Sequence, residues 1–438
     1  MAEVRPFTAV LFDPARVNMA DVVAPPYDVV SEEERENLYN RNPYNILHVD
    51  FGKEFSHDND SFNKYTRARD LLRSWLSSGI LKPVDKPAFY FYQLDYIHDG
   101  KAKTLRGFIG LVKIEEFGKG NIHPHEATHS KPKSDRLMLT RICRGNLSPI
   151  FAIYKSPEKR INKIFHELKK RAPFIHFTDE DSITHSLWIV SDIKEIEIIK
   201  RELADKAIFI ADGHHRYETA LEYKKEVSLI YPHQDGTDPS DYVMMFLANM
   251  ADEGLTILPT HRVVKDLPSD WMERLKDYFE ISDLRIKNVS DIIKKIHGKE
   301  HTIGLYVDKK AFSLRYLGKD LSELHPALRY LDVSILHNLI LDKIFGVKDV
   351  HYEMNPERII QMINSGAYRA GFFLNPTKAE EVEVVALSSL RMPPKSTYFY
   401  PKLKTGLVLN LFDYSFGGEA TKGSQMLEIG SKSLKKFP

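Results

Sequence analysis

The pattern of apolar and polar positions in the N-terminal part of the chain predicts one short strand and two helices. An apolar run at residues 7–12 has the length of a short strand. A helix is expected from Ser31, because Glu34 follows three residues later and the two residues form a capping-box pattern. Apolar residues at helical spacing predict a second helix over residues 61–78, and Gly79 ends it.

Strands are predicted to dominate the next part of the chain. Residues 88–96 alternate and are rich in aromatic side chains, and residues 104–114 are expected to pair with them as a hairpin across residues 99–100. The pattern then stops at residues 121–136, which carry many charged and histidine side chains and almost nothing apolar. Long polar loops in compact domains are usually functional or disordered, so this segment is a candidate functional loop.

The middle of the chain contains the sharpest change of pattern. The apolar residues 207–211 have the length and composition of a buried strand, and they lead directly into Asp212 and Gly213. A helix is predicted to begin immediately after this glycine. Further along, two apolar runs at 243–250 and 255–264 are separated by a short polar turn and predict another hairpin.

After residue 270 the pattern is that of a separate α/β unit. The expected helices are 270–279, 332–345 and 356–365, and the expected strands are 302–307 and 370–374. A polar, lysine-containing loop is expected at 391–404. We therefore divide the chain into an N-terminal α/β segment 1–87, a middle domain 88–268, a C-terminal α/β domain 269–415 and a polar tail 416–438.

Composition defines the class of protein. The 438 residues, of which 42% are hydrophobic and 28% charged, match an ordinary soluble globular chain of two or three domains. Sixty-two basic and sixty-one acidic residues leave a net charge of +1, which provides no general field for nucleic acid, so no nucleic-acid partner is expected. The single Cys143 fits a reducing compartment. No apolar run is long enough for a membrane span or a signal peptide, and a cytoplasmic protein is expected.

The helix expected in the middle of the chain has an unusual first turn. His214, His215 and Arg216 place basic side chains where the helix dipole is positive, at a cost of about 0.3 to 1 kcal/mol each when charged. Backbone N–H groups at a helix start attract anions, and a bound phosphate would reverse that cost. The alternative is that Asp212 is an ordinary N-cap, which would account for the aspartate and not for the three residues after the glycine. We therefore predict a phosphate-binding turn.

Six stretches of the sequence together resemble an uncharacterised protein family, DUF1015. They are VAPPYDVV (23–30), NPYNILHV (42–49), HPHEATHSKPKSDR (123–136), IADGHHRYETA (210–220), NMADEGLTILPTHRVV (249–264) and MPPKSTYFYPKLKTGL (392–407). Because they span most of the chain, it is identified as a member of this family. The Asp-Gly-His-His-Arg turn also resembles the phosphate-binding turn of the ParB/sulfiredoxin-like fold, and of the free serine kinases that carry the same turn.

These resemblances imply a fold and an activity. The expected fold is α+β, with a ParB/sulfiredoxin-like middle domain that is elaborated by N-terminal and C-terminal α/β additions. The expected activity is that of a nucleotide-dependent phosphotransferase, a kinase that acts on a serine-like hydroxyl group. Its expected cofactors are Mg²⁺ with ADP or ATP, and its expected small-molecule substrate is serine or phosphoserine. Members of the family are often encoded beside enzymes of serine biosynthesis, which implies a role in serine metabolism.

The segment 123–136 and the glycine turn supply the groups that phosphoryl transfer needs. Glu126 is the candidate base that accepts the proton of the acceptor hydroxyl. The other candidates for catalysis are His125, His215 and Asp212. The candidates for phosphate or nucleotide binding are Gly213, His214, His215, Arg216, Lys131, Lys133 and Arg136.

Metal ligands and contacts with the substrate are predicted on other segments. Asp212 and Asp252 are the candidate magnesium ligands, although an acidic residue before Gly254 is also ordinary turn chemistry. A zinc site made of His123, His125 and His129 is the alternative interpretation of the histidine-rich segment, and a solvated charged loop is a third. The candidates for substrate or lid contacts are His261, Arg262, Lys395 and Lys402, for which an exposed surface position is the alternative.

Two other functions are compatible with the same residues. A phosphoserine phosphatase would use a histidine or a metal-bound water in the same pocket. A ParB-like nucleotide-binding clamp on nucleic acid, which is not an enzyme, would need a basic face, and the net charge argues against it. The chain lacks the Gly-x-x-x-x-Gly-Lys-Ser/Thr pattern and a Gly-x-Gly-x-x-Gly after a strand, which excludes the two common nucleotide-binding fingerprints.

Overall fold

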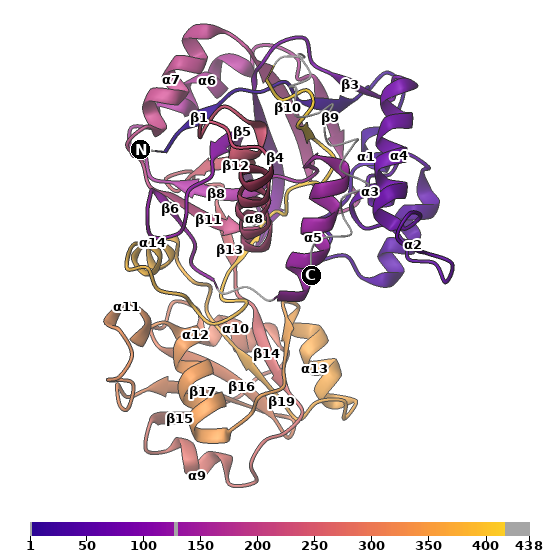
Figure 1. Cartoon of the computed structure of the whole chain (residues 1–438). Helices are drawn as coiled ribbons and strands as arrows, with labels where there is room; N and C mark the ends of the chain where they lie inside the picture. The colour runs from indigo at the N-terminus through magenta and orange to yellow at the C-terminus, as the bar shows by residue number, and fades with distance from the viewer. Residues whose placement is uncertain (1, 127–129, 417–438) are drawn as a thin grey trace. The chain divides into compact units, whose positions relative to one another are not determined.

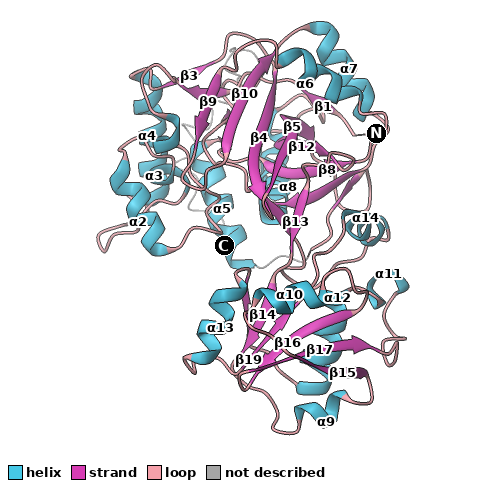
Figure 2. Cartoon of the chain, turned by 180° about the vertical axis from the view of Figure 1, so that it is seen from behind, coloured by secondary structure: helices cyan, strands magenta, loops and turns pink. Residues whose placement is uncertain are grey.

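A computed structural model describes residues 2–126 and 130–416, without the side chains of 130–132. The described residues form a mixed α+β structure with several sheets, as expected from the sequence. They divide into two compact units, of which the first contains 2–122, 130–255 and 401–416, and the second contains 123–126 and 256–400. Figure 1 and Figure 2 show one large sheet in each unit. The four-part division expected from the sequence stays a prediction, and most of the expected tail lies outside the described residues.

The large sheet of the first unit has the strand order β6-β11-β8-β12-β5-β4-β10-β9, with β1 paired to β5. Its strands are β1 (Val4–Arg5), β4 (Phe89–His98), β5 (Lys101–Lys113), β6 (Ile122–His123), β8 (Ile150–Tyr154), β9 (Ile175–Thr178), β10 (Thr184–Val190), β11 (Ile208–Asp212) and β12 (Tyr242–Asn249). Strands β8 and β12 are parallel, whereas β11 and β8 are antiparallel. The hairpin predicted across residues 99–100 is confirmed, because β4 and β5 pair up to His98 and Lys101.

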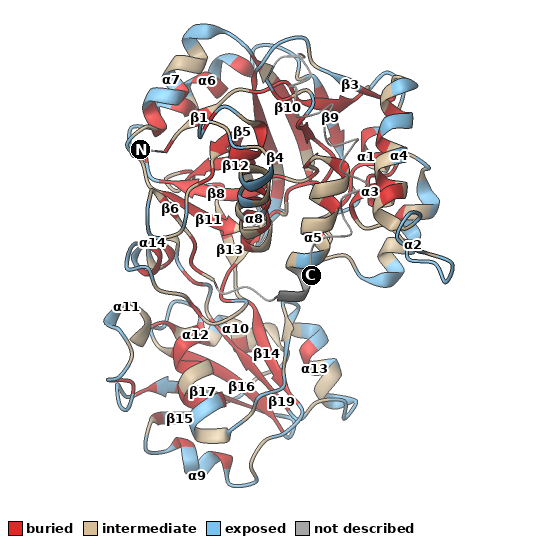
Figure 3. Cartoon of the chain, viewed as in Figure 1, coloured by how far each residue is buried: buried red, intermediate tan, exposed pale blue. Residues whose placement is uncertain are grey.

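Both faces of this sheet are covered, which explains why its central strands are apolar throughout instead of alternating. All residues of β12 are buried, and Figure 3 shows the central strands in the buried colour. The helices α6 (Arg160–Leu168), α7 (Ile193–Leu203) and α8 (His214–Ile230) share one apolar core with strand side chains. The N-terminal segment also packs on the sheet, since the rings of Phe7 and Tyr90 lie 5.0 Å apart.

The N-terminal helices follow the capping signals in the sequence. The helices are α1 (Met19–Val22), α2 (Glu32–Arg41), α3 (Leu47–Asp50), α4 (Lys64–Ser77) and α5 (Ser130–Cys143). Helix α2 begins as predicted, because Ser31 Oγ accepts a hydrogen bond from the backbone N–H of Glu34 at 3.2 Å. Helix α4 begins after the capping side chain of Asn63, which confirms the helix predicted over 61–78. Figure 1 shows α5 between α4 and α8.

The loop predicted over residues 121–136 is wrong in its second half, because α5 begins at Ser130. Charged residues in the first half of this helix are held by ion pairs with other segments. Asp135 pairs with Lys64 Nζ at 2.7 Å, and Arg136 pairs with Asp50 at 3.0 Å. Ion pairs thus take the place of apolar contacts on this part of the helix, and the apolar periodicity that predicts a helix is missing from the sequence.

The sheet of the second unit has the strand order β15-β17-β16-β19-β14-β18. Its strands are β14 (His261–Val264), β15 (Phe279–Leu284), β16 (Thr302–Val307), β17 (Lys310–Tyr316), β18 (Val350–Glu353) and β19 (Ala370–Phe373). Its helices are α9 (Trp271–Leu275), α10 (Ser290–Ile296), α11 (Pro326–Arg329), α12 (Asp332–Ser334), η2 (Ile335–Phe345), α13 (Pro356–Asn364) and α14 (Ala379–Leu387). The α/β pattern predicted for the region after 270 is confirmed in these elements.

The hairpin predicted between residues 243–250 and 255–264 is wrong. Strand β12 pairs with β5 and β8, whereas β14 pairs with β18 and β19 of the second unit. Between them, β13 (Thr256–Leu258) pairs with β20 (Tyr398–Tyr400), which lies in the predicted loop 391–404. Two apolar runs with a polar turn between them mark two strands, but they do not show that the strands are neighbours. Shorter pairs are β2 (Val10–Phe12) with β3 (Leu81–Pro83) and β7 (Gly145–Asn146) with β21 (Asn410–Leu411); η1 (Pro239–Asp241) precedes β12.

A buried polar network joins the C-terminal segment, residues 401–416, to the rest of the first unit. Lys404 Nζ lies 2.6 Å from Asp179 Oδ2, and His185 Nε2 lies 3.0 Å from the same oxygen. The other ring nitrogen of His185 accepts a hydrogen bond from the hydroxyl of Tyr92 at 2.6 Å. Burial by itself would raise the pKa of Asp179, but the hydrogen bonds from His185 and Lys404 outweigh it and hold the pKa well below its usual value. The carboxylate therefore stays charged in the folded protein.

We expect Asp179→Asn to lower the free energy of unfolding at pH 7 by about 3 kcal/mol, because it leaves the buried Lys404 without its counter-charge. Urea denaturation measures this, with Asp181→Asn at an exposed site as the control. Since the pKa of Asp179 is lowered on folding, its contribution is complete above the unfolded-state pKa and is lost as the pH falls through the folded-state pKa. Equal stability of the two variants at pH 7 would contradict the role of this network.

Candidate functional site

The predicted strand, glycine and helix occur at the end of β11. Residues Ile208 to Ala211 are buried in the sheet, and α8 begins at His214 directly after Gly213. The backbone of Gly213 has a φ of 91°, in the left-handed region that favours glycine. Tyr217 anchors the first turns of α8, because its hydroxyl donates a hydrogen bond to the carbonyl of Glu115 at 2.7 Å. The direction of this helix start is therefore set by the core of the first unit.

Asp212 is an ion-pair partner and not the cap of the helix. The N-cap residue is Gly213, which has no side chain to hydrogen-bond with the first turn. Asp212 Oδ2 lies 3.1 Å from Arg216 Nη2, and Oδ1 lies 3.2 Å from Lys402 Nζ. Burial would raise the pKa of Asp212, but Lys402 and then Arg216 outweigh burial and lower it. The N-cap interpretation of the sequence is therefore wrong.

Arg216 ties the helix start to the segment between β7 and β8. Its guanidinium donates a hydrogen bond to Ser148 Oγ at 2.7 Å and another to the carbonyl oxygen of Pro149. It also covers the glycine turn: a Cβ atom on Gly213 would lie 2.8–2.9 Å from atoms of the guanidinium. Arg216 thus shapes the turn itself, in addition to the phosphate contact predicted for it.

Basic side chains gather around this turn. His214, His215 and Arg216 form the first turn of α8, which contains no acidic residue. Lys402 joins them from the C-terminal segment, and its side chain is only 14% exposed. Asp212 is the acidic partner of two of these basic residues, Arg216 and Lys402. Lys402, predicted as a substrate or lid contact, lies beside Asp212 at this turn.

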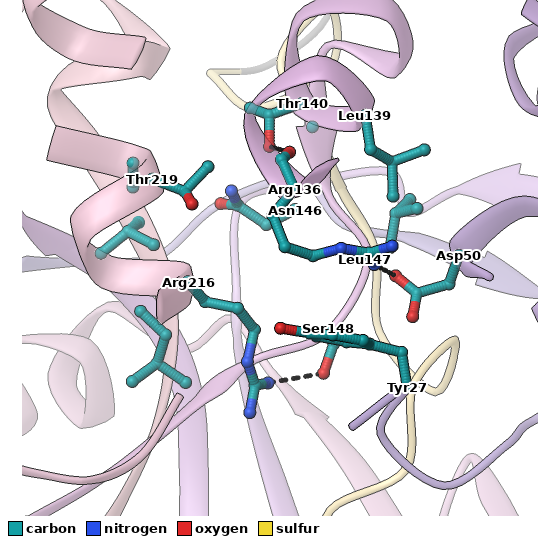
Figure 4. Close-up of a pocket in the computed structure, with 14 residues that line it drawn as sticks. Tyr27, Asp50, Arg136, Leu139, Thr140, Asn146, Leu147, Ser148, Arg216 and Thr219 are labelled. Carbon is teal, nitrogen blue, oxygen red and sulfur yellow. Dashed lines mark hydrogen bonds and ion pairs between the residues drawn. The ribbon is translucent and has the colours of Figure 1, made fainter. Parts of the chain in front are cut away.

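A small cavity of about 50 Å³ lies beside the cluster. Its polar lining comes from Tyr27, Asp50, Arg136, Thr140, Asn146, Ser148, Arg216 and Thr219. Figure 4 shows the side chains of Arg216 and Thr219 reaching it from one helix and that of Arg136 from another. The cavity is thus formed between α5 and α8, next to α3.

Two of the basic residues predicted in segment 123–136 lie near α8 in ion pairs. Arg136 is buried, and it binds Asp50 at 3.0 Å and Asp135 at 2.6 Å while its guanidinium lies 4.1 Å from the centre of the Tyr27 ring. Lys133 forms an ion pair with Glu218 of α8. The interpretation of these residues as a solvated loop is wrong for Arg136. Lys131 and His129 lie outside the residues whose side chains are described.

The other predicted site residues belong to the second unit. Arg262 is fully buried and donates hydrogen bonds to the carbonyl oxygens of Pro394 and Lys395 at 3.0 Å each, so the surface position considered for it is wrong. Burial lowers the pKa of its neighbour His261 to about 3, and the ring accepts a hydrogen bond from the backbone of Leu374. Both residues hold the second unit together.

The segment with His125 and Glu126 packs within this same unit. His125 is buried and its Nε2 lies 2.9 Å from Thr397 Oγ1. A carboxylate oxygen of Glu126 accepts a hydrogen bond from the backbone N–H of Lys395 at 2.6 Å. The two predicted constellations therefore belong to different units, with Arg136 and Lys133 in the first and His125 and Glu126 in the second. Their catalytic roles stay predictions.

Asp212 and Asp252 do not form one magnesium site. Asp212 pairs with Phe151 at the beginning of β8, whereas β12 ends at Asn249 beside Tyr154 at the other end of β8, three residues before Asp252. Asp252 instead accepts a hydrogen bond from the backbone N–H of Gly254 at 2.9 Å, as in ordinary turn chemistry. Among the described residues, no group of three or more His, Cys, Asp or Glu side chains is placed to hold a metal ion.

The sequence analysis did not single out three residues of the cavity, Thr219 on α8 and Tyr27 and Asp50 on the opposite side. Tyr27 lies inside the stretch VAPPYDVV, and Asp50 directly follows NPYNILHV. An aspartate at the end of an apolar run is a signal of a buried carboxylate, because such a group needs a specific partner. That partner is Arg136, which is 86 residues away in the sequence.

We expect Gly213→Ala to lower the free energy of unfolding by about 2 to 3 kcal/mol, because the new Cβ meets the Arg216 guanidinium and also requires a left-handed backbone. Gly118→Ala is the matched control, since its φ is +78° and nothing lies within 4 Å of the added Cβ. The control isolates backbone strain, with an expected loss of about 1 kcal/mol. Denaturant titration measures both, and equal losses would contradict the close contact.

Three solved structures illustrate the similarities found. A conserved hypothetical protein from Pyrococcus furiosus has 15% sequence identity and a TM-score of 0.33, and the match covers 67% of this chain and 94% of that chain. Free serine kinase in complex with AMP has 14% identity and a TM-score of 0.34, and the match covers 64% of this chain and 83% of that chain. SbnI with C-terminal truncation from Staphylococcus aureus has 11% identity and a TM-score of 0.35, and the match covers 75% of this chain and 95% of that chain. Similarities at this level do not establish a shared fold. A comparison with curated proteins finds no match. Among the described helices, none has both the length and the apolar sequence that a membrane span requires.

The family comparison is decisive for classification. The model of DUF1015, described as a protein of unknown function, matches residues 4–334. That range includes β11, the turn at Gly213, α8 and every described cavity residue named above. Since the match extends over most of the 438 residues, the chain belongs to the DUF1015 family.

Proposed function

We propose that this protein is a nucleotide-dependent phosphotransferase that acts on the hydroxyl group of a small, serine-like molecule, with the nucleotide phosphates bound at the start of α8. The observation that carries the proposal is the cluster of basic side chains around a helix start whose N-cap residue is a glycine. His214, His215 and Arg216 are in the first turn, and Lys402 lies beside Asp212.

Electrostatics supports an anionic ligand at this turn. Each charged basic side chain in a first turn opposes the helix dipole, and a phosphate group would interact favourably with both the dipole and the side chains. Asp212 contributes one carboxylate to this turn, between Arg216 and Lys402. Phosphates are the ligands that match several cations at a helix start.

The proposed reaction has a simple balance. The acceptor hydroxyl oxygen forms a bond to the terminal phosphorus of the nucleotide, the bond from that phosphorus to the bridging oxygen breaks, and the shortened nucleotide leaves with the bonding electrons. The hydroxyl proton passes to a general base. The cations at the α8 start hold the phosphate oxygens and stabilise the charge on them.

Mg²⁺ is proposed to bind together with the nucleotide. It commonly uses one or two protein carboxylates and completes its coordination with phosphate oxygens and water. Asp212 fits this role as a single carboxylate at the turn, whereas Asp252 lies at the other end of β8. Bound Mg²⁺ neutralises phosphate charge. We further propose that the middle domain has a ParB/sulfiredoxin-like arrangement, with the β11–α8 turn as its phosphate-binding turn.

We expect ATP or ADP with Mg²⁺ to bind with a Kd in the micromolar range, measured by isothermal titration calorimetry. Lys402→Met is expected to weaken binding about tenfold or more, because it removes a cation from the turn. His215→Asn is a second variant that preserves the helix start. Lys200→Met is the control, since Lys200 lies on the exposed side of α7 beside Glu197.

The outcome decides between the alternatives. Absence of nucleotide binding, or equal binding by Lys402→Met and Lys200→Met, contradicts the proposal. Transfer is measured by incubating the protein with ATP and L-serine and detecting phosphoserine by mass spectrometry. Release of phosphate from phosphoserine without added nucleotide would instead identify a phosphatase.

A further inference from the structure

We propose that the cavity between α5 and α8 binds a small molecule of the amino-acid or hydroxy-acid class, with Asp50 and Thr219 receiving its hydrogen-bonding group and the two arginines facing its carboxylate. The assignment of this molecule as the phosphoryl acceptor rests on the function proposed above. The binding site itself rests on the cavity and its lining side chains, and it can be tested without nucleotide.

Two buried polar atoms in the cavity lining lack partners among the described residues. They are Oδ2 of Asp50 and Oγ1 of Thr219, in residues that are each only 4% exposed. In Figure 4, Asp50 bonds to Arg136 through its other oxygen. A threonine inside a helix commonly donates its hydroxyl to the carbonyl four residues earlier, and Thr219 does not. Unpartnered buried atoms are costly, and a ligand in the cavity would satisfy both.

The charges that face the cavity match a molecule with two different ends. Arg136 and Arg216 present guanidinium groups, and Arg136 uses three of its five N–H donors on Asp50 and Asp135. Both arginines lower the pKa of Tyr27 and of Asp50, although burial raises each pKa more strongly. The site therefore offers cationic donors to a carboxylate and one carboxylate oxygen to an ammonium or hydroxyl group.

The size of the cavity sets the size of the ligand. About 50 Å³ accommodates a few non-hydrogen atoms and is too small for a purine base. A nucleotide is therefore excluded from the cavity itself. A carboxylate with a neighbouring hydroxyl or ammonium group is of the right size and has the complementary charges.

Arg216 connects this cavity to the proposed phosphate-binding turn. Its guanidinium covers Gly213, and the same side chain lines the cavity next to Ser148. A ligand in the cavity and phosphates at the α8 start would thus both lie beside Arg216. This adjacency is the reason for assigning the cavity ligand as the acceptor.

The test is a titration of the full chain at pH 7 without nucleotide, followed by ligand-observed NMR. L-Serine and D-glycerate carry a carboxylate and a hydroxyl group, acetate carries the anion alone, and ethanolamine carries the hydroxyl and ammonium groups without the anion. We expect saturable binding of the first two probes, with acetate and ethanolamine weaker by at least tenfold. No binding of L-serine and D-glycerate, or equal binding of all four probes, would overturn the proposal.

Two variants localise the binding. Asp50→Asn is expected to weaken L-serine binding at least tenfold, because it removes the charge that faces the ammonium group. Thr219→Val is expected to weaken it threefold to tenfold without lowering the melting temperature, since its hydroxyl has no partner in the folded protein. Asp60→Asn, at an exposed position of the same unit, is the control. L-Serine binding by Thr219→Val that equals that of the wild type would place the ligand elsewhere and overturn the proposal.

The two proposals fail in distinguishable ways. If L-serine binds as described and ATP and ADP do not, the phosphotransferase proposal fails and the cavity site stands. If ATP and ADP bind at the α8 start and the four probes do not bind, the cavity proposal fails alone.

Discussion

Buried cations in the first unit have to meet anions, because an unpaired buried charge costs several kcal/mol. Asp212 meets this requirement for Arg216 and Lys402, and Asp50 meets it for Arg136. Asp212 and Arg216 are four residues apart, whereas Lys402 and Arg136 each lie far along the chain from their partner. The two long-range ion pairs join the C-terminal segment to the start of α8 and α5 to α3. The candidate site is made of the same side chains. Its geometry therefore depends on the packing of the whole unit and not on one flexible loop.

Two features beside these ion pairs support the two proposed ligand sites. Around the glycine turn the basic groups outnumber the single carboxylate of Asp212, which favours an anion such as phosphate. In the neighbouring cavity, Asp50 and Thr219 each keep one polar atom without a partner among the described residues. A site for two ligands, one with phosphates and one small and polar, accounts for both observations because Arg216 lies between them.

Local chemistry explains which features could be predicted from the sequence. The cap at Ser31 requires residues three positions apart, and the left-handed turn at Gly213 requires only a glycine between a strand and a helix. Family membership followed from short motifs in the same way. Prediction failed where pairing is decided at long range, as for the incorrect hairpin at 243–264, and where a helix is held by ion pairs, as in the first turns of α5. Apolar periodicity does not indicate the start of α5, because the buried side chains there are charged.

The sequence by itself determined the capped helices and apolar strands, the strand–glycine–helix turn and the family. Tertiary structure alone decided which chemical groups share a site: it placed Lys402 and Arg136 with α8, and it placed His125 and Glu126 in the other unit. It also decided that Asp50 is buried against an arginine 86 residues away. The physical reason is that a hydrogen-bonding or apolar pattern repeats along the chain, whereas an ion pair between distant segments leaves no periodic trace in the sequence.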